Sequence, residues 1–253
     1  TWKVHSLEHL FPINPKIFCL KKTLNGSLWI GTQSGLVEAK PDGSGGFLYQ
    51  LHSVETGALR HNAVSSLLPD PTKPQVLWIA TKGGGLSRLD LETRQFNQLY
   101  TRNGLPNDVL YGILPDARGN LWMSSNKGII RYNPVTKAIR NFTDADGLQS
   151  NEFNTWAYAP GPDGALMFGG INGLNIFSPE SFSDNPHVPA VYLTGISINN
   201  KSINVGDSTG LLKQAIEFET NIKLSFDQRS ITLAFAALEF TTAAKNRFRW
   251  ILE

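Results

Sequence analysis

GNLWMSSNKGI, residues 119–129, is the stretch that decides the fold, because the chain contains four versions of it. Each version consists of a turn, a Leu-Trp-apolar core, two small residues, a short loop and a Gly followed by an apolar residue. The other three are GSLWIGTQSGL at 26–36, VLWIATKGGGL at 76–86 and GALMFGGINGL at 164–174. Met167 takes the Trp position in the last copy. A pattern that recurs at a fixed period is the sequence signature of a repeat architecture.

The period of the repeat indicates which architecture it builds. Trp29, Trp78, Trp122 and Met167 follow one another at steps of 44 to 49 residues, and propeller blades repeat at about 40 to 50 residues. Short apolar segments recur between the cores, so each repeat is predicted to form a blade of four antiparallel strands. The recurring Trp is then expected in the core between blades and not at a ligand. The Pro-rich stretch 70–74, within the longest step, is predicted to be a longer hairpin loop.

The composition excludes several classes of protein. The 253 residues include 23 Lys and Arg against 21 Asp and Glu, for a formal charge of +2, which gives no electrostatic case for a nucleic-acid partner. A content of 41% hydrophobic and 17% charged residues is that of a globular protein. The single Cys19 allows neither an internal disulfide nor a thiolate metal cage. The 23 Gly and 14 Pro indicate many short strands joined by tight turns.

The repeat stops after Pro179, and a second domain is predicted there. A Pro-containing connector, 185–189, leads to alternating segments that we expect to be strands, at 191–198, 222–226, 231–235 and 248–252. The fold class is therefore all-β. Residues 1–184 are predicted to form four propeller blades that belong to a larger propeller, and residues 185–253 to form the start of an immunoglobulin-like β-sandwich. That second region is shorter than the roughly 100 residues of a complete sandwich, so it is expected to be truncated.

Two further phrases carry a resemblance to a known family. The linkers contain NGLPN at 103–107 and DGL at 146–148, and the last repeat ends in FGGINGLNIFSP at 168–179. With these phrases the chain resembles the two-component-regulator propeller of bacterial sensors, and residues 189–252 resemble the triple-tyrosine (Y_Y_Y) domain that follows this propeller. One departure is visible, because the aromatic residues near the end are not the usual tyrosines but Phe240, Phe248 and Trp250.

The resemblance implies a function. Such regions are the periplasmic sensor parts of histidine kinases in the inner membrane, and carbohydrate sensing is common among them. It implies a small-molecule or oligosaccharide ligand, a homodimer, and membrane attachment only through segments outside this chain. Two other readings stay open: a propeller lyase or hydrolase acting on a polysaccharide, and a protein-interaction scaffold.

Each enzyme template that the chain resembles lacks a necessary partner. The segment 206–210, GDSTG, matches a nucleophile elbow, but no His follows it in the chain. His5 and His9 have the spacing of zinc ligands, but Ser6 stands where a zincin has Glu. The segment 144–147 resembles the start of a calcium loop whose later ligands are out of register. We therefore expect no catalytic residue, no metal and no cofactor in this region.

The repeat also identifies candidate ligand-binding residues, because a residue that varies between blades is free to specify a ligand. The loops that enter each innermost strand and the loops between the second and third strands are expected on one face of a propeller. Asn62, Asn107 and Asn151 in the entry loops are expected to cap the loop backbone. The candidates on this face are Arg60, His61, Lys82, Arg102, Asn126, Lys127 and Glu152. Their four cations favour an anionic ligand or an acidic sugar over a neutral oligosaccharide.

Overall fold

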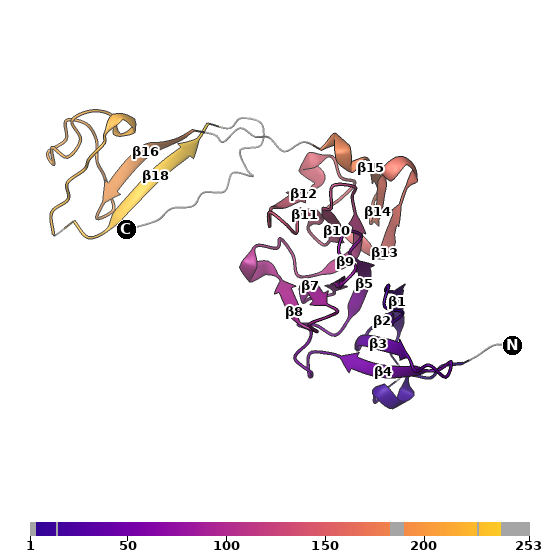
Figure 1. Cartoon of the computed structure of the whole chain (residues 1–253). Helices are drawn as coiled ribbons and strands as arrows, with labels where there is room; N and C mark the ends of the chain where they lie inside the picture. The colour runs from indigo at the N-terminus through magenta and orange to yellow at the C-terminus, as the bar shows by residue number, and fades with distance from the viewer. Residues whose placement is uncertain (1–3, 14, 183–189, 227, 239–253) are drawn as a thin grey trace. The chain divides into compact units, whose positions relative to one another are not determined.

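The computed structural model describes residues 4–13, 15–182, 190–226 and 228–238 (Figure 1). The chain forms two compact units, Thr1–Phe182 and Ser183–Glu253. Among the described residues, no helix combines the length and the apolar character needed to cross a bilayer.

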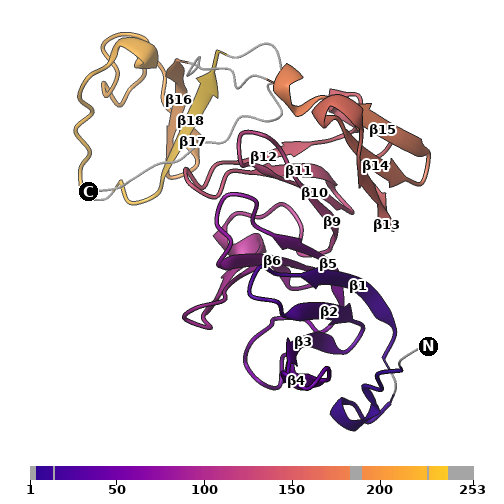
Figure 2. The ribbon, with the colours of Figure 1, turned by 45° about the vertical axis from the view of Figure 1, so that its right-hand side comes forward.

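The first unit contains four antiparallel sheets, which are the predicted blades (Figures 1 and 2). In each sheet the strands follow one another in chain order, and the first strands of successive blades pack side by side. The first blade consists of β1 (Ile17–Lys22), β2 (Leu28–Thr32), β3 (Gly35–Pro41) and β4 (Phe47–His52). The second consists of β5 (Val64–Pro69), β6 (Val76–Thr81), β7 (Gly85–Asp90) and β8 (Phe96–Leu99). The third consists of β9 (Leu110–Pro115), β10 (Leu121–Ser125), β11 (Gly128–Tyr132) and β12 (Ile139–Phe142).

The fourth blade differs from the prediction, because within the described residues it has three strands and not four. These are β13 (Phe153–Pro160), β14 (Leu166–Gly170) and β15 (Gly173–Phe177). After β15 the sequence Ser178-Pro179 starts a 3-10 turn, since proline cannot donate to a ladder. Phe182 then packs against Trp122 and ends the unit. The other 3-10 turns of this unit are η1 (Glu8–Leu10), η2 (Thr101–Asn103), η3 (Asp144–Asp146) and η4 (Pro162–Gly164), and this last turn is η5 (Pro179–Ser181).

The second strand of each of the first three blades is buried along nearly its whole length. Such a strand has neighbours on both faces, which is why its sequence reads as a continuous apolar run and not as an alternation. Trp29, Trp78 and Trp122 are 0%, 3% and 1% exposed. The prediction that these residues form the core between blades is therefore confirmed.

In the second and third blades an Asp in the turn before the Trp strand accepts a hydrogen bond from the indole N–H. The Nε1 of Trp78 donates to Asp70 at 2.9 Å and that of Trp122 donates to Asp116 at 2.8 Å. Asp70 also accepts three hydrogen bonds from Thr72 and Lys73, which closes the predicted long loop between β5 and β6. In the first blade the Trp29 Nε1 is buried without a hydrogen-bond partner among the described residues.

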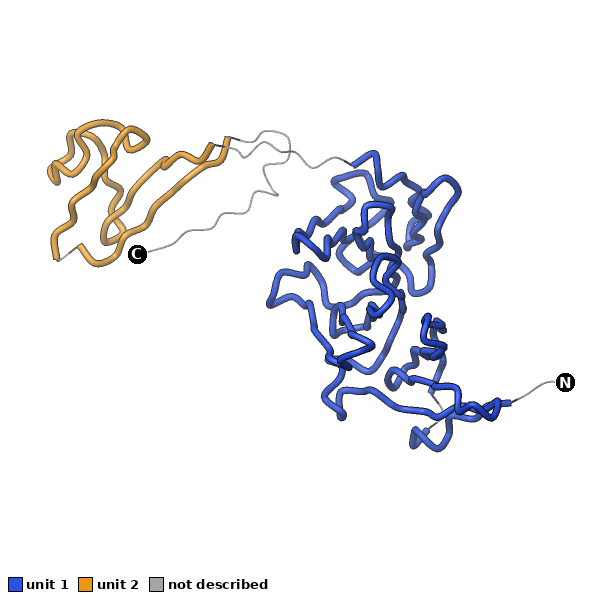
Figure 3. Tube along the Cα trace, in the orientation of Figure 1, with its two compact units in different colours: residues 1–182 blue, residues 183–253 orange. Residues whose placement is uncertain are grey.

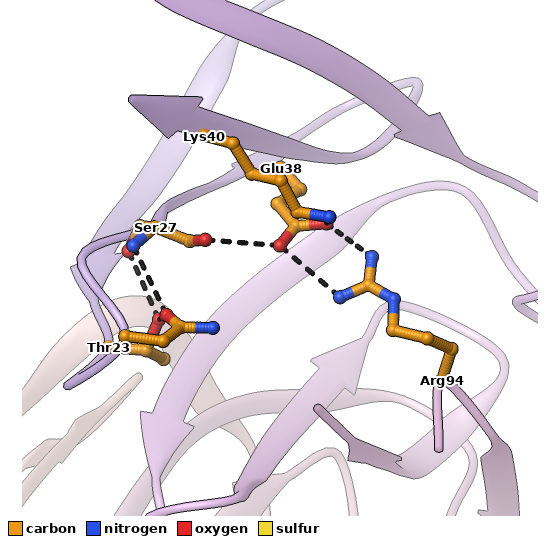
Figure 4. Close-up of polar contacts among 6 residues, drawn as sticks. Thr23, Ser27, Glu38, Lys40 and Arg94 are labelled. Carbon is orange, nitrogen blue, oxygen red and sulfur yellow. Dashed lines mark hydrogen bonds and ion pairs between the residues drawn. The ribbon is translucent and has the colours of Figure 1, made fainter. Parts of the chain in front are cut away.

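A buried ion pair joins the first and second blades at Trp29 (Figure 4). Glu38 on β3 is 0% exposed. Its carboxylate accepts hydrogen bonds from both terminal nitrogens of Arg94, a residue in the turn between β7 and β8. Ser27 Oγ donates to the same carboxylate at 3.1 Å, and Lys40 Nζ lies 3.7 Å from it. The Arg94 guanidinium also lies 5.5 Å from the centre of the Trp29 ring. Removal of Arg94 would leave the buried Glu38 carboxylate with only the more distant Lys40 among its described cations, which is costly for a buried charge.

His52 at the end of β4 lies beside this ion pair. Its ring stacks on Trp29 with the ring centres 5.7 Å apart, and the residue is buried. Burial lowers the pKa of His52 to about 4, and the positive charges of Arg94 and Lys40 act in the same direction, against the opposing effect of Glu38. The folded protein therefore holds this imidazole neutral.

The second unit contains one described sheet, in the order β17-β16-β18 (orange in Figure 3). A sandwich has two sheets, so the sheet of the described residues does not by itself form the predicted sandwich. The sheet packs on a small core of Ile196, Ile198, Ile203, Leu212 and Ile216. Its elements are β16 (Val191–Ile198), β17 (Lys201–Ser202), β18 (Ile231–Ala237) and the turn η6 (Ile216–Phe218).

The described residues of this unit do not contain two of the predicted strands. Residues 222–226 do not form the predicted strand, because Ile222 packs on the core without joining a β-ladder. The strand predicted at 248–252 lies outside the described residues, as do Phe240, Phe248 and Trp250. The segment 206–210 is a turn, in which Asp207 accepts hydrogen bonds from Thr209, and this turn is followed by no helix of the kind that a nucleophile elbow needs.

We predict that Trp122→Ala lowers the free energy of unfolding by about 3–5 kcal/mol, because it leaves a cavity between the third and fourth blades. The ring of Trp122 stacks on Phe142 and packs at a tilted angle against Phe177. Urea unfolding measures the loss. Val135→Ala is the control, since this residue is 77% exposed, and it should change the free energy by no more than about 0.5 kcal/mol. A loss below about 1 kcal/mol for Trp122→Ala would contradict the assignment of this residue to the core.

We also predict that the free energy of unfolding falls as the pH is lowered from about 6.5 to about 4, because the unfolded chain protonates His52 in this interval and the folded protein does not. The contribution of His52 to this fall is at most about 3 kcal/mol. Urea unfolding of wild type and His52→Gln at several pH values measures it. The variant should show a shallower decline, and equal slopes for the two proteins would refute the assignment.

Candidate ligand-binding face

Hairpins and entry loops come together at one end of the first unit. Lys82 N donates to Ala63 O, at the entry to β5, at 2.9 Å. Gly83 N and Gly85 N donate to Asp108 O, at the entry to β9, at 3.1 and 2.8 Å. These bonds tie the β6–β7 hairpin to its own blade and to the next one. We call this surface the hairpin face; it comprises the entry loops 53–63, 100–109 and 143–152 and the hairpins 33–34, 82–84, 126–127 and 171–172.

The entry loops are closed by side chains that repeat between blades. The Oδ1 atoms of Asn62 and Asn151 accept from the backbone N–H near the start of their own loops, at 2.8 and 3.0 Å. This confirms the capping role predicted for them. Asn107 also caps its loop backbone, since its Oδ1 accepts from Val109 N at 2.8 Å. The bond to the start of this loop comes from Asp108, whose Oδ1 accepts from Thr101 N at 2.7 Å.

Arg60 and His61 are held within the second blade. The Arg60 guanidinium lies 3.8 Å from the centre of the Tyr100 ring, a cation–π distance. His61 Nδ1 accepts from Ala63 N at 3.1 Å. The His61 ring lies against the hairpin, and a Cβ on Gly83 would come within 2.9 Å of it. Gly83 also has φ +138°, so both space and backbone conformation favour glycine here.

Lys82 lies among aromatic rings that come from other blades. Its Nζ is 4.9 Å from the centre of the Phe18 ring on β1 and 5.4 Å from that of Trp156 on β13. The two rings lie 5.1 Å apart. The second blade thus places an ammonium group against side chains of the first and fourth blades.

The remaining candidates lie separately on the hairpin face. Asn126 occupies in the third blade the position of Lys82, and its Oδ1 accepts from Tyr111 OH at 2.7 Å. The side chains of Arg102, Lys127 and Glu152 are exposed. Within the described residues, no hydrogen bond or ion pair joins any two side chains of the seven predicted residues. The structure therefore gathers them on one face without forming a single cluster.

The hairpin face carries acidic residues as well as the four predicted cations. The entry loops also carry acids, among them Glu55, Asp108 and Asp146. Glu55 accepts from Asn62 and Asp108 accepts from Thr101, so these carboxylates serve the loops. In the described part of the chain, no carboxylate lies within ion-pair distance of the four cations Arg60, Lys82, Arg102 and Lys127.

Phe18, Tyr111 and Trp156 are functional candidates that the sequence analysis missed. The ladder between the first two strands slips at Phe18, Ser65 and Tyr111 in the first three blades and over the segment 154–157 in the fourth. A β-bulge of this kind redirects a side chain out of the ladder. A signal for these positions existed in the sequence, because Phe18, Tyr111 and Trp156 each lie 11 residues before the Trp or Met of their repeat.

Neither a reactive thiol nor a metal cluster is found near these residues. Cys19, beside the first bulge, is partly buried, and burial raises the pKa of its thiol to about 12. A thiol of that pKa is not a nucleophile at neutral pH. The described residues contain no group of three or more His, Cys, Asp or Glu side chains that could hold a metal ion.

Part of the third blade and its entry loop is similar to a known family. Residues 104–127 match the family model of the two component regulator propeller. This segment contains residues 104–109 of the entry loop to β9, the strand β9 and the Leu-Trp strand β10 of the third blade.

Relatives and solved structures point in the same direction. Over 148 residues the chain is 33% identical to Histidine kinase P4 of Formosa agariphila, an alignment that covers 58% of this chain and 11% of that protein. An extracellular domain assigned to a hybrid two-component system of B. thetaiotaomicron aligns with a TM-score of 0.51 at 17% identity, over 87% of this chain and 41% of that one. PorZ of Porphyromonas gingivalis, a surface component of the type-IX secretion system, aligns with a TM-score of 0.55 at 14% identity, over 94% and 40%. The solved structures support the propeller fold, and the chain spans less than half the length of each protein.

Proposed function

We propose that this chain is a ligand-sensing, extracytoplasmic region of a bacterial two-component receptor. The observation that carries the proposal is the 33% identity to a protein named as a histidine kinase, supported by the match of residues 104–127 to the two-component regulator propeller. In this proposal the chain lies in the periplasm, is attached to the inner membrane through segments outside it, and acts as a homodimer.

The hairpin face is the proposed ligand site. It presents Arg60, Lys82, Arg102 and Lys127 without a carboxylate partner among the described residues. Guanidinium and ammonium groups match carboxylate and sulfate oxygens. The proposed ligand is therefore an anionic small molecule or acidic oligosaccharide, and it is bound without being cleaved.

The ligand would signal by favouring one arrangement of the receptor over another. A ligand that binds two arrangements equally shifts no equilibrium, however tightly it binds. The hairpin face is suited to differential binding because its loops come from successive blades, so a small rotation between blades changes the spacing of its cations.

Phosphorylation of the complete receptor tests the proposal. Membrane vesicles that carry the receptor are incubated with labelled ATP and with a trigalacturonate or a sulfated disaccharide, and neutral galactotriose serves as the comparison. We expect an anionic probe to change the rate of phosphohistidine formation. Arg60→Ala should raise the half-maximal concentration of that probe, since each lost charged hydrogen bond costs about 1.5–3 kcal/mol.

Arg118→Ala is the matched control, because Arg118 is exposed in the β9–β10 turn at the other end of its blade. It should leave the response unchanged. Release of new reducing ends from a probe by the purified chain would contradict the proposal, as would a phosphorylation rate that no probe alters.

A further inference from the structure

Three side chains from different blades meet at the hairpin face, and we call them the bulge cluster: Phe18, Lys82 and Trp156. Phe18 lies at the bulge of β1, Trp156 lies within the bulged segment of β13, and Lys82 comes from the β6–β7 hairpin. The centres of the two rings are 5.1 Å apart, and the Lys82 Nζ lies within 5.4 Å of both. The fold thus places two aromatic rings and one ammonium group together at residues far apart in the chain.

Trp156 does not behave like the tryptophans of the repeat. It is 53% exposed, whereas Trp29, Trp78 and Trp122 are at most 3% exposed. Its backbone has φ +63°, a left-handed conformation that a bulky residue rarely adopts. Such conformations persist only where the surroundings enforce them, and they cluster at functional sites. The bulge therefore holds an indole face at the surface, where it contributes little to the core.

Lys82 supplies the charge of the cluster. Its ammonium group lies against the rings of Phe18 and Trp156. No carboxylate of the described residues lies within ion-pair distance of it. Contact with aromatic rings satisfies a cation only in part, because a ring offers a weaker attraction than an anion does. An anion that arrives beside Trp156 would therefore meet a positive charge that is already in position.

We infer that the bulge cluster binds a ring-shaped anion, an inference that rests on the proposed function of the hairpin face. The flat face of the ligand ring stacks on the exposed indole of Trp156, and its carboxylate or sulfate pairs with Lys82 Nζ. Two kinds of molecule share this chemistry: a pyranose with an acidic group and an aromatic acid. Both combine an apolar ring face with an anionic edge.

Calorimetric titration of the full chain tests the inference with three probes: trigalacturonate, neutral galactotriose and benzoate. Binding of trigalacturonate without galactotriose identifies an acidic sugar, and binding of benzoate alone identifies an aromatic acid. Either result supports the cluster. If neither anion binds at millimolar concentration, the inference is overturned.

Variants then locate the site. Trp156→Ala should raise Kd about 30-fold, as loss of a central Trp anchor does, and Trp156→Phe should keep most of the affinity because it keeps a ring. Lys82→Gln should raise Kd about 10- to 100-fold for the anionic probe. Lys73→Gln is the matched control, since this lysine is exposed in the β5–β6 turn at the other end of the same blade, outside the hairpin face, and its Kd should equal that of wild type.

Two outcomes separate this inference from the proposed function. If Trp156→Ala, shown to be folded by its circular dichroism, binds the anion as wild type does while Arg60→Ala binds it less tightly, the bulge cluster is wrong and the hairpin face remains the site. If wild type binds the anion through Trp156 but also cleaves it, the cluster stands and the sensor function falls.

Discussion

The burial of one apolar strand between neighbouring blades is the constraint on which the rest of the first unit depends. In the second and third blades this strand carries a buried Trp, and an Asp in the preceding turn accepts a hydrogen bond from its indole N–H. These large side chains are therefore buried without leaving a polar atom unpaired. The first blade has no such Asp. There a buried ion pair between Glu38 and Arg94 lies over Trp29 and joins two blades in its place.

That constraint also determines where variable residues can be presented. Because the second strand is locked between blades, the first strand of each blade adjusts its register, and it does so next to the hairpin in every case. The bulge is a constant of the fold, while the residue at the bulge changes from Phe18 to Ser65, Tyr111 and Trp156. The bulge residue is buried in the second blade, where Ser65 is 0% exposed, and exposed in the fourth, where Trp156 is 53% exposed. The repeat thus keeps the backbone while the bulge side chain varies between blades.

Much of this could be predicted from the sequence, since the signals are local and periodic. The regular spacing of the Trp residues predicts the blades, and the Pro-rich stretch predicts the longer loop between β5 and β6. Trp156 was missed because a bulge arises from pairing between strands, which no local propensity records. The three-stranded form of the last blade within the described residues, and the absence of a strand at 222–226, also involve pairing between strands, which local sequence does not record.

In the proposed complex Trp156, and not a tryptophan of the repeat, contacts the ligand. Indole N–H resonances report on this directly, because the chain has six Trp residues and Trp156→Phe assigns the signal of interest. During titration with trigalacturonate, the account predicts that the Trp156 signal shifts while those of Trp29, Trp78 and Trp122 stay in place. A titration that moves the buried signals and leaves that of Trp156 unchanged would contradict it.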